Sequence, residues 1–131
     1  MKDDVNVFEV LSKIKCDTDK KGNFTYVSWA VAWKETKKVF PKANYTIYTT
    51  DSGYPAFINK SINQGGFVKV GVTIGDLEHI EFYPILDYSN RAMLNDKITA
   101  FDINKSIQRA LTKALAKHGL MLNLYCGEDL D

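Results

Sequence analysis

The sequence predicts an α+β fold: an antiparallel β-meander of three to four strands packed on a long C-terminal helix, with two N-terminal helices. Two observations lead to this fold class. Apolar residues recur at helical spacing near both ends of the chain, whereas between about residues 44 and 86 they alternate with a period of two. The connections between the expected strands are also short, as an antiparallel meander requires.

The first helix is expected over about residues 6–15. Asn6 and Glu9 make a capping-box-like start, and apolar residues follow at helical spacing. The next segment, residues 16–25, is polar and contains a glycine, so we expect it to be a loop. A second helix is expected over about residues 28–40.

Ser28 is the expected cap of this second helix, and Pro41 stops it because proline cannot continue a helix. Trp29 and Trp33 are one helical turn apart on its apolar stripe. Because such stripes usually pack into a core, we expect both tryptophans to be buried.

The expected strands are rich in β-branched and aromatic residues, and the residues between them are typical of turns. The strands are predicted at residues 44–50, 56–62, 67–74 and 79–86. The turns between them are predicted at residues 51–55, 63–66 and 75–78. The third strand, FVKVGVTI, has the clearest alternation, with its apolar residues on one face.

A longer polar connection, residues 87–98, precedes the last helix. Thr99 and Asp102 form a second capping box at its start, and Gly119 marks its C-terminus. The apolar run after it, LMLNLY, is too short for its period to distinguish a helix from a strand.

The last helix has a cationic stripe opposite its apolar face. The stripe consists of Lys105, Arg109, Lys113 and Lys117. No acid occurs between Asp102 and Glu128, and like charges four residues apart destabilise a helix by roughly 0.2–0.5 kcal/mol per pair. A phosphate backbone would supply the missing counter-charge. The charge pattern alone leaves a second reading open, a solvated face without a partner, because lysine is also a good helix former.

The charge of the chain is distributed unevenly, although its net charge is only +1. Residues 97–118 contain five cations and one acid, whereas residues 76–87 contain four acids and no cation. This separation focuses the electrostatic field more strongly than the net charge indicates. The basic segment therefore points to an anionic partner.

The sequence lacks the usual signatures of catalysis. Gly65-Gly66 is followed by Phe67 rather than by the Lys-Ser/Thr pair of a phosphate-binding loop. His118 is expected to be a hydrogen-bonded core histidine or a helix cap rather than a base. The acids of residues 76–87 lack the nearby lysine that a metal-dependent nuclease site needs. We therefore expect no enzymatic activity, no cofactor and no metal site.

Aromatic residues are the second feature that fits a nucleic acid. The chain has seven Tyr, seven Phe and two Trp, and exposed aromatic rings beside cations stack bases with roughly 1–3 kcal/mol each. Tyr26, which precedes the second helix, is the aromatic residue expected to contact the ligand.

Residues 1–131 are expected to form a single domain in the cytoplasm, with the ending GEDLD compatible with a further C-terminal tail. The N-terminus is acidic and lacks the apolar segment of a signal peptide. No apolar run approaches the roughly 20 residues that span a membrane. Cys16 and Cys126 show no metal spacing, so reduced thiols are expected.

Two segments resemble the Sak-type single-strand annealing proteins of bacteriophages, relatives of the eukaryotic Rad fifty-two recombination mediator. The first segment is YVSWAVAWKETKKVFPKANYTI, residues 26–47. The second is INKSIQRALTKALAKHGLMLNLYCGEDL, residues 103–130. It contains Arg-Ala-Leu and Lys-Ala-Leu, then His-Gly-Leu, an apolar stretch with Tyr, and Gly-Glu-Asp-Leu. Together the segments cover about 50 of the 131 residues.

The resemblance implies an Arg/Lys-rich helix behind a curved sheet, subunits that close into rings, and single-stranded DNA in a basic groove. Arg109 or Lys113 would be the residue equivalent to a groove-lining arginine, and the distance to Gly119 favours Lys113. The relatives often have a second basic residue three positions later. This chain has Thr112 or Ala116 there, so the path of the phosphates would differ.

The leading interpretation is a protein that binds single-stranded DNA and anneals it in homologous recombination of phage DNA, without ATP. Its partners would be single-stranded DNA, further copies of the chain in a ring or filament, and a phage exonuclease or host replication protein. The expected DNA-binding residues are Lys105, Arg109, Lys113, Lys117 and Tyr26. The alternative is a protein-interaction or assembly module whose basic helix binds an acidic protein surface, such as residues 76–87 of a neighbouring subunit.

Overall fold

The computed structural model of the chain describes residues 5–21 and 24–126. Its main elements are α1 (Val7–Ser12), α2 (Trp29–Val39), β3 (Asn44–Ile47), β4 (Phe67–Ile74), β5 (Leu77–Pro84) and α3 (Ala100–Lys117). Its smaller elements are β1 (Asp19–Lys21), β2 (Phe24–Tyr26) and the 3-10 helices η1 (Asn95–Lys97) and η2 (Leu122–Tyr125). The Gly-Glu-Asp-Leu segment, residues 127–130, lies outside the described residues.

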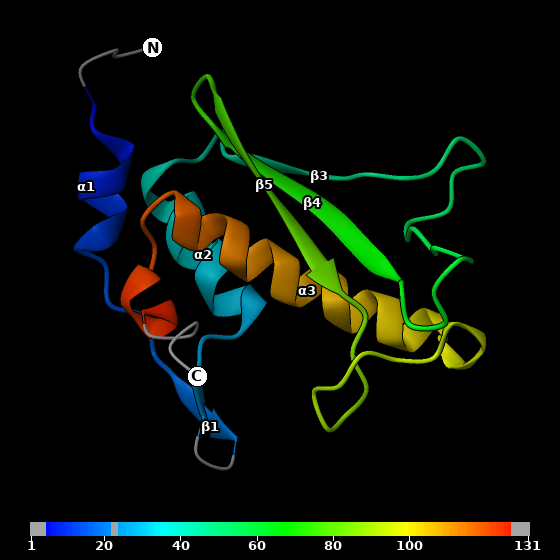
Figure 1. Cartoon of the computed structure of the whole chain (residues 1–131). Coiled ribbons are helices and arrows are strands. Elements are labelled where there is room, and N and C mark those ends of the chain that lie inside the picture. The colour runs from blue at the N-terminus through cyan, green and yellow to red at the C-terminus, as the bar shows by residue number, and fades with distance from the viewer. Residues whose placement is uncertain (1–4, 22–23, 127–131) are drawn as a thin grey trace.

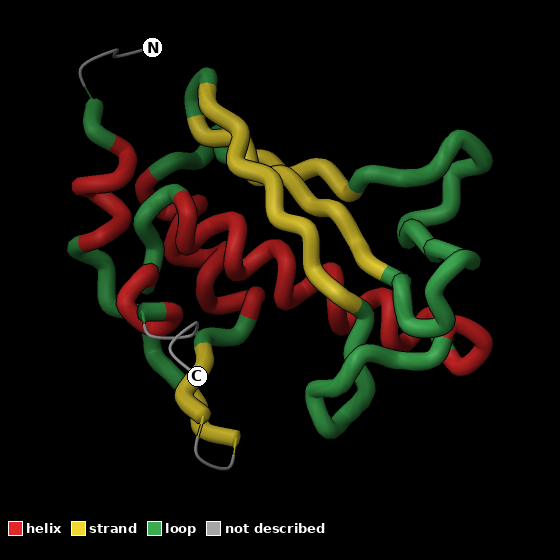
Figure 2. Tube along the Cα trace, in the orientation of Figure 1, coloured by secondary structure: helices red, strands yellow, loops and turns green. Residues whose placement is uncertain are grey.

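Helix α3 packs along one face of an antiparallel sheet with the strand order β3-β4-β5 (Figure 1). Helix α2 packs against α3, and α1 lies near the C-terminal end of α3. Figure 2 shows that β3, β4 and β5 form one layer and the long helix a second, with the β1–β2 hairpin apart from both. The expected meander on a long C-terminal helix, with two N-terminal helices, is therefore confirmed.

The core lies between the sheet and α3. Val68, Val70 and Val72 of the central strand β4 are fully buried. They alternate with residues of the opposite face because side chains of a strand point to alternate sides. The helix contributes Ile103, Ala110, Leu111, Ala114 and Leu115. The small side chains of Ala110 and Ala114 let the helix approach β4 closely.

The predicted strand at residues 56–62 is wrong. Only Phe57 pairs with a strand, through an isolated bridge to the first residue of β4. The side chain of Asn95 donates hydrogen bonds to the carbonyl oxygens of Asn59 and Ile62, at 3.1 and 2.7 Å. Because a side chain rather than a neighbouring strand bonds to these carbonyls, the segment is a loop tied to η1.

Further boundaries differ from the prediction. The first predicted strand, residues 44–50, ends at Ile47, because the Thr50 N–H bonds to the Tyr54 carbonyl oxygen in the following turn rather than to β4. The expected loop at residues 16–25 contains the β1–β2 hairpin, whose three-residue strands are too short to show a period of two. The fourth predicted strand, residues 79–86, begins two residues earlier, at Leu77. Gly75 has a φ of 63°, which allows a tighter turn between β4 and β5.

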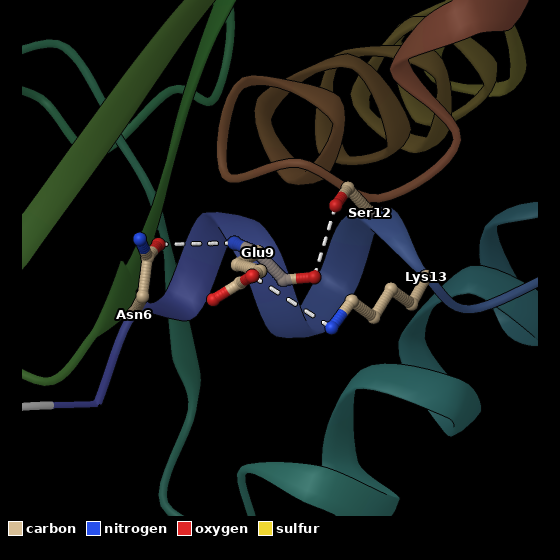
Figure 3. Close-up of polar contacts among 4 residues, drawn as sticks. All are labelled: Asn6, Glu9, Ser12 and Lys13. Atoms are coloured by element: carbon tan, nitrogen blue, oxygen red, sulfur yellow. Dashed lines mark hydrogen bonds and ion pairs between the residues drawn. The ribbon is translucent and has the colours of Figure 1, made fainter.

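The α1 cap is confirmed, although the helix is shorter than residues 6–15. The Oδ1 atom of Asn6 accepts a hydrogen bond from the Glu9 N–H at 3.0 Å (Figure 3). The hydroxyl of Ser12 donates to the Glu9 carbonyl oxygen at 2.9 Å, and the Lys13 Nζ lies 3.7 Å from the Glu9 carboxylate. This ion pair is largely exposed and adds little stability.

Both predicted ends of α3 are confirmed. Thr99 and Asp102 form a reciprocal capping box, in which each side chain accepts the other residue's backbone N–H. The helix stops before Gly119, whose φ is 122°. A Cβ atom at Gly119 would come within 2.7 Å of the Phe8 carbonyl oxygen, so this glycine also allows α1 to approach the end of α3.

The second helix agrees with its predicted range, but the burial of Trp29 is a wrong prediction. Trp29 is 38% exposed. Trp33 is partly buried and packs edge-on against Tyr45 of β3, with ring centroids 5.2 Å apart. The fully buried positions of α2 belong to the smaller Ala32 and Thr36, because the helix lies close to its neighbours there.

Both cysteines are free thiols, as expected. Cys16 is buried and Cys126 is exposed. Burial raises the pKa of the Cys16 thiol, and the nearby carboxylates of Glu35 and Asp17 raise it further. Among the described residues, no helix combines the length and apolar character needed to cross a membrane.

Candidate nucleic-acid interface

The side of α3 that faces the edge strand β5 carries the cations expected from the sequence. Two of them contact side chains of β5, and a third contacts the loop that follows this strand. We call this surface the basic flank. It consists of Lys105, Arg109, Lys113 and Lys117 of α3 with Tyr83 of β5, Asn90 of the following loop and Tyr125 of η2.

Lys113 lies between two aromatic rings. Its Nζ is 5.6 Å from the ring centroid of Tyr83 and 5.4 Å from that of Tyr125. Tyr83 faces α3 because it pairs with the buried Val68 of β4. The two rings are within cation–π distance and hold the ammonium group in position without removing its positive charge. A cation positioned in this way can pair with a phosphate.

Arg109 is positioned by the loop after β5. Its Nη1 donates a hydrogen bond to the Asn90 Oδ1 at 3.3 Å. Asn90 adopts a φ of 61°, and the Asp87 carboxylate holds its turn by accepting from the N–H groups of Ser89 and Arg91. A guanidinium group has five N–H donors, so this contact orients Arg109 and leaves donors for a bidentate anion.

The positive charge of Lys117 is offset within the chain, contrary to the expectation of an unrelieved stripe. Its Nζ lies 2.8 Å from the Glu81 Oε1 as an ion pair that lacks the alignment of a hydrogen bond. It also donates to the Ile80 carbonyl oxygen at 3.1 Å. The acid is absent from the helix sequence, but the register of β5 brings it to the last turn of α3.

Of the remaining two predicted residues, Lys105 lies at the start of the basic flank and Tyr26 lies outside it. The Lys105 Nζ is 5.3 Å from the ring centroid of Phe101, which is 69% exposed near the start of α3. Tyr26 is 44% exposed in β2, in the separate two-stranded sheet. The α3 flank thus brings together the four cations, whereas Tyr26 belongs to a different sheet.

The expected core histidine is confirmed at the C-terminal end of α3. His118 is 3% exposed, and its Nε2 donates to the Val72 carbonyl oxygen at 2.7 Å. Its ring contacts that of His79, with centroids 4.5 Å apart. Burial lowers the pKa of His118, and His79 lowers it further, against the opposing effect of the Val72 hydrogen bond. A neutral, hydrogen-bonded imidazole fits a structural role.

The opposite side of α3 borders a cleft that the sequence analysis missed. The cleft has a volume of about 110 Å³. Its residues are Trp29, Tyr45, Ile47, Val70, Asn104, Ile107, Gln108 and Leu111. The four-residue spacing of Asn104 and Gln108 was the only signal in the sequence, and it did not reveal the aromatic residues opposite.

Sequence reasoning also missed the neighbours that position the cations. Tyr83 and Asn90 come from β5 and the loop after it, and Tyr125 comes from η2, the element that follows α3. Within the described ranges, no cluster of three His, Cys, Asp or Glu side chains is arranged to hold a metal ion. The basic flank offers positive charge, aromatic faces and hydrogen-bond donors, a combination suited to binding a polyanion with planar bases.

Comparison with known families agrees with this chemistry. A family model described as Sak Single Strand Annealing Protein matches residues 3–131. Neither the curated proteins nor the solved structures gave a match. The match extends over the hairpin, the sheet, α3 and the basic flank, and so it covers far more than the two resembling segments. The chain belongs to the Sak family of single-strand annealing proteins.

Proposed function

We propose that this protein binds single-stranded DNA and anneals complementary strands in homologous recombination of phage DNA, in the cytoplasm of the host cell. The observation that carries the proposal is the family match over residues 3–131, which includes the basic flank. The reaction forms base pairs and breaks no covalent bond. It therefore requires no nucleophile, and the proposal includes neither ATP nor a cofactor.

Arg109 and Lys113 are the proposed main contacts to the DNA backbone. Both lie in the middle of the basic flank, where Asn90 orients Arg109 and the rings of Tyr83 and Tyr125 orient Lys113. Lys105 lies nearer the helix start and Lys117 pairs with Glu81, so both are peripheral in this proposal. Tyr26 would contact the strand only where it passes the β1–β2 hairpin.

The ion pair of Lys117 changes the expected salt dependence. Single strands give a slope of log affinity against log salt of roughly −0.7 per phosphate contact. Four cations would give about −3 per subunit, whereas three cations give about −2. A ring would multiply this slope, because each subunit would add its contacts.

Assembly into a ring or filament is part of the proposal. Strands β3 and β5 form the two edges of the sheet, and all four residues of β3 are exposed. Edge strands have backbone groups available for pairing with another chain. Pairing of the β3 edge of one copy with the β5 edge of the next would be head-to-tail, which generates a closed ring or a filament. A phage exonuclease or host replication protein would supply or use the single strands.

The decisive experiment is an annealing assay with two complementary oligonucleotides at several salt concentrations. Arg109→Ala/Lys113→Ala should lose strand binding and annealing. Lys13→Ala is the matched control, because the Lys13 side chain is 74% exposed on α1, outside the basic flank. Full annealing by the double variant at physiological salt would refute the role of the basic flank.

The alternative is an assembly module whose basic helix meets an acidic protein surface. The contact between Lys117 and Glu81 favours it as a second candidate, because α3 already pairs with an acid of residues 76–87 within one chain. A mass measurement on the same double variant distinguishes the two. Lost DNA binding at unchanged mass supports the DNA interface, whereas lost assembly supports the protein interface.

A further inference from the structure

The sheet face opposite α3 carries a cluster of aromatic rings around one lysine. The side chains of β4 alternate, so Phe67 and Lys69 point away from the buried valines. In the register of the sheet, Lys69 pairs with Phe82 of β5. We call the cluster the aromatic platform. It consists of Tyr48, Phe57, Phe67, Lys69 and Phe82.

The members of the platform contact one another in a row. Phe57 and Phe67 are stacked with centroids 5.2 Å apart, and Phe67 meets Phe82 edge-on at 5.9 Å. The Lys69 Nζ lies 5.5 Å from the Phe82 centroid and 4.5 Å from that of Tyr48. The row therefore crosses the sheet from the loop before β4, over β5, to the residue that follows β3.

The platform is partly open to solvent, since Phe82 is exposed and its other residues are half-buried. In Figure 1, α3 runs along the other side of the sheet, and none of the helices covers the face that bears the platform. Phe82 is 57% exposed, a large value for an aromatic ring in a sheet. Among the ion pairs of the described chain, none includes Lys69, so its neighbours in the structure are the two rings.

The far end of the platform is fixed by a hydrogen bond across the sheet. The Tyr48 hydroxyl donates to the Glu78 Oε2 at 2.6 Å. The Glu78 carboxylate passes over Gly71 of β4, where a Cβ atom would collide with the same oxygen. The glycine thus allows Glu78 of β5 to reach Tyr48, and the tyrosine ring beside Lys69 is held in place.

The chemistry of the platform fits unpaired bases better than a second copy of the chain. Every base has a flat face that stacks on an aromatic ring, and a phosphate next to that base can pair with a nearby lysine. Packing of the platform against another protein face would take the Lys69 ammonium group out of water, at a desolvation cost, since Lys69 makes no ion pair within the described chain. A sheet with aromatic rings on its open face and helices on the other is also an arrangement that binds single strands in other folds.

We propose that the aromatic platform stacks unpaired bases of the bound strand, with Phe82 as the main ring and Lys69 pairing with a phosphate. This inference rests on the proposed function, because it assumes that the chain binds single-stranded DNA. It assigns a base-dependent contact to the open sheet face, whereas the basic flank makes contacts that depend on the backbone alone.

The test compares a fluorescent oligonucleotide with an abasic oligonucleotide of the same length, which retains the phosphates and lacks the bases. Phe82→Leu should weaken binding of the ordinary oligonucleotide about five-fold to a hundred-fold, the range for one lost stacking contact. It should leave the binding of the abasic oligonucleotide unchanged. Phe82→Tyr, which keeps the ring, should bind both oligonucleotides like the parent protein.

The outcomes separate this inference from the proposed function. Unchanged binding of the ordinary oligonucleotide by Phe82→Leu overturns the platform, as does an equal loss for both oligonucleotides. If Phe82→Leu changed the mass of the assembly but left DNA binding per subunit unchanged, the platform would be a protein interface. That result would also overturn the inference. Arg109→Ala/Lys113→Ala should weaken both oligonucleotides equally. If the double variant bound both oligonucleotides like the parent protein, this would count against the basic flank. The comparison of the Phe82 variants would remain valid.

Discussion

The two faces of the three-stranded sheet are built from the same strands but differ in almost every physical property. The face toward α3 consists of fully buried valines of β4, whereas the opposite face has Phe67, Lys69 and the exposed Phe82. One face binds the protein's own helix, and the other is free of helices (Figure 1).

The difference teaches where stability and recognition lie in this fold. Burial of the covered face supplies stability, since a fully buried aliphatic side chain contributes roughly 1.5–3 kcal/mol. The open face and the basic flank keep cations and rings at the surface, where they can meet a ligand. Substitutions on the covered face should therefore change folding, and substitutions elsewhere should change binding.

The largest effect is expected from shortening a side chain on the covered side. Leu115→Ala removes a fully buried side chain of α3 and should lower the free energy of unfolding by about 2–5 kcal/mol. Phe82→Leu on the open face should change it by no more than about 0.5 kcal/mol. Urea denaturation measures both. Similar losses of unfolding free energy in the two variants would contradict the idea that only the covered face supplies stability.

A large effect on binding is expected from the basic flank. Arg109→Ala/Lys113→Ala removes two proposed phosphate contacts, so the slope of log affinity against log salt should become shallower by about 1.4. Fluorescence anisotropy with a single strand at several salt concentrations gives the slope. Urea midpoints like those of the parent protein would show that the loss concerns binding, and an unchanged slope would contradict the prediction.

A smaller effect on stability is expected from pH. Burial lowers the pKa of His118 below its usual value near 6.5, so below that pH the unfolded chain binds more protons than the folded chain. Stability should be complete above about pH 6.5 and should decline as the pH falls toward the folded pKa. Urea midpoints at about pH 7.5 and about pH 5.5, on either side of the ordinary histidine pKa, measure it. His118→Gln should flatten this dependence, and an equally steep decline in that variant would exclude His118 as its source.

The smallest effect is expected at Lys117. Because its charge is already paired with Glu81, Lys117→Ala should change the salt slope by much less than the roughly 0.7 of one phosphate contact. Arg109→Ala provides the comparison and should show the full change, because the partner of Arg109 is the uncharged Asn90. Equal changes for the two variants would mean that DNA displaces Glu81 from Lys117.

Local signals made much of the fold predictable. Strand β4 agrees with its predicted residues 67–74 because its alternation is uninterrupted. Helix α3 starts at the predicted cap and stops at Gly119, since capping depends on neighbours in sequence. The strand expected at residues 56–62 failed for the opposite reason, because Asn95, more than thirty residues away, bonds to its carbonyls.

The candidate site was predictable only in part. The four-residue spacing of the cations revealed the stripe from sequence, but their neighbours depend on sheet register. Pairing with β4 turns Tyr83 and Glu81 toward α3, so that one ring contacts Lys113 and one acid contacts Lys117. The spacing of the cations along the helix contains no information on either contact. The sequence therefore overestimated the positive charge that the stripe offers to a ligand.

Gly119 shows that a position can resist substitution without contacting a ligand. Any side chain there would strain a backbone with a φ of 122° and collide with the Phe8 carbonyl oxygen. In a library of variants selected for recombination, Gly119 should therefore be retained as strictly as a cation of the basic flank. Ranking positions by retention alone would then place a packing glycine among the proposed DNA contacts, and only binding measured on folded variants would separate the two.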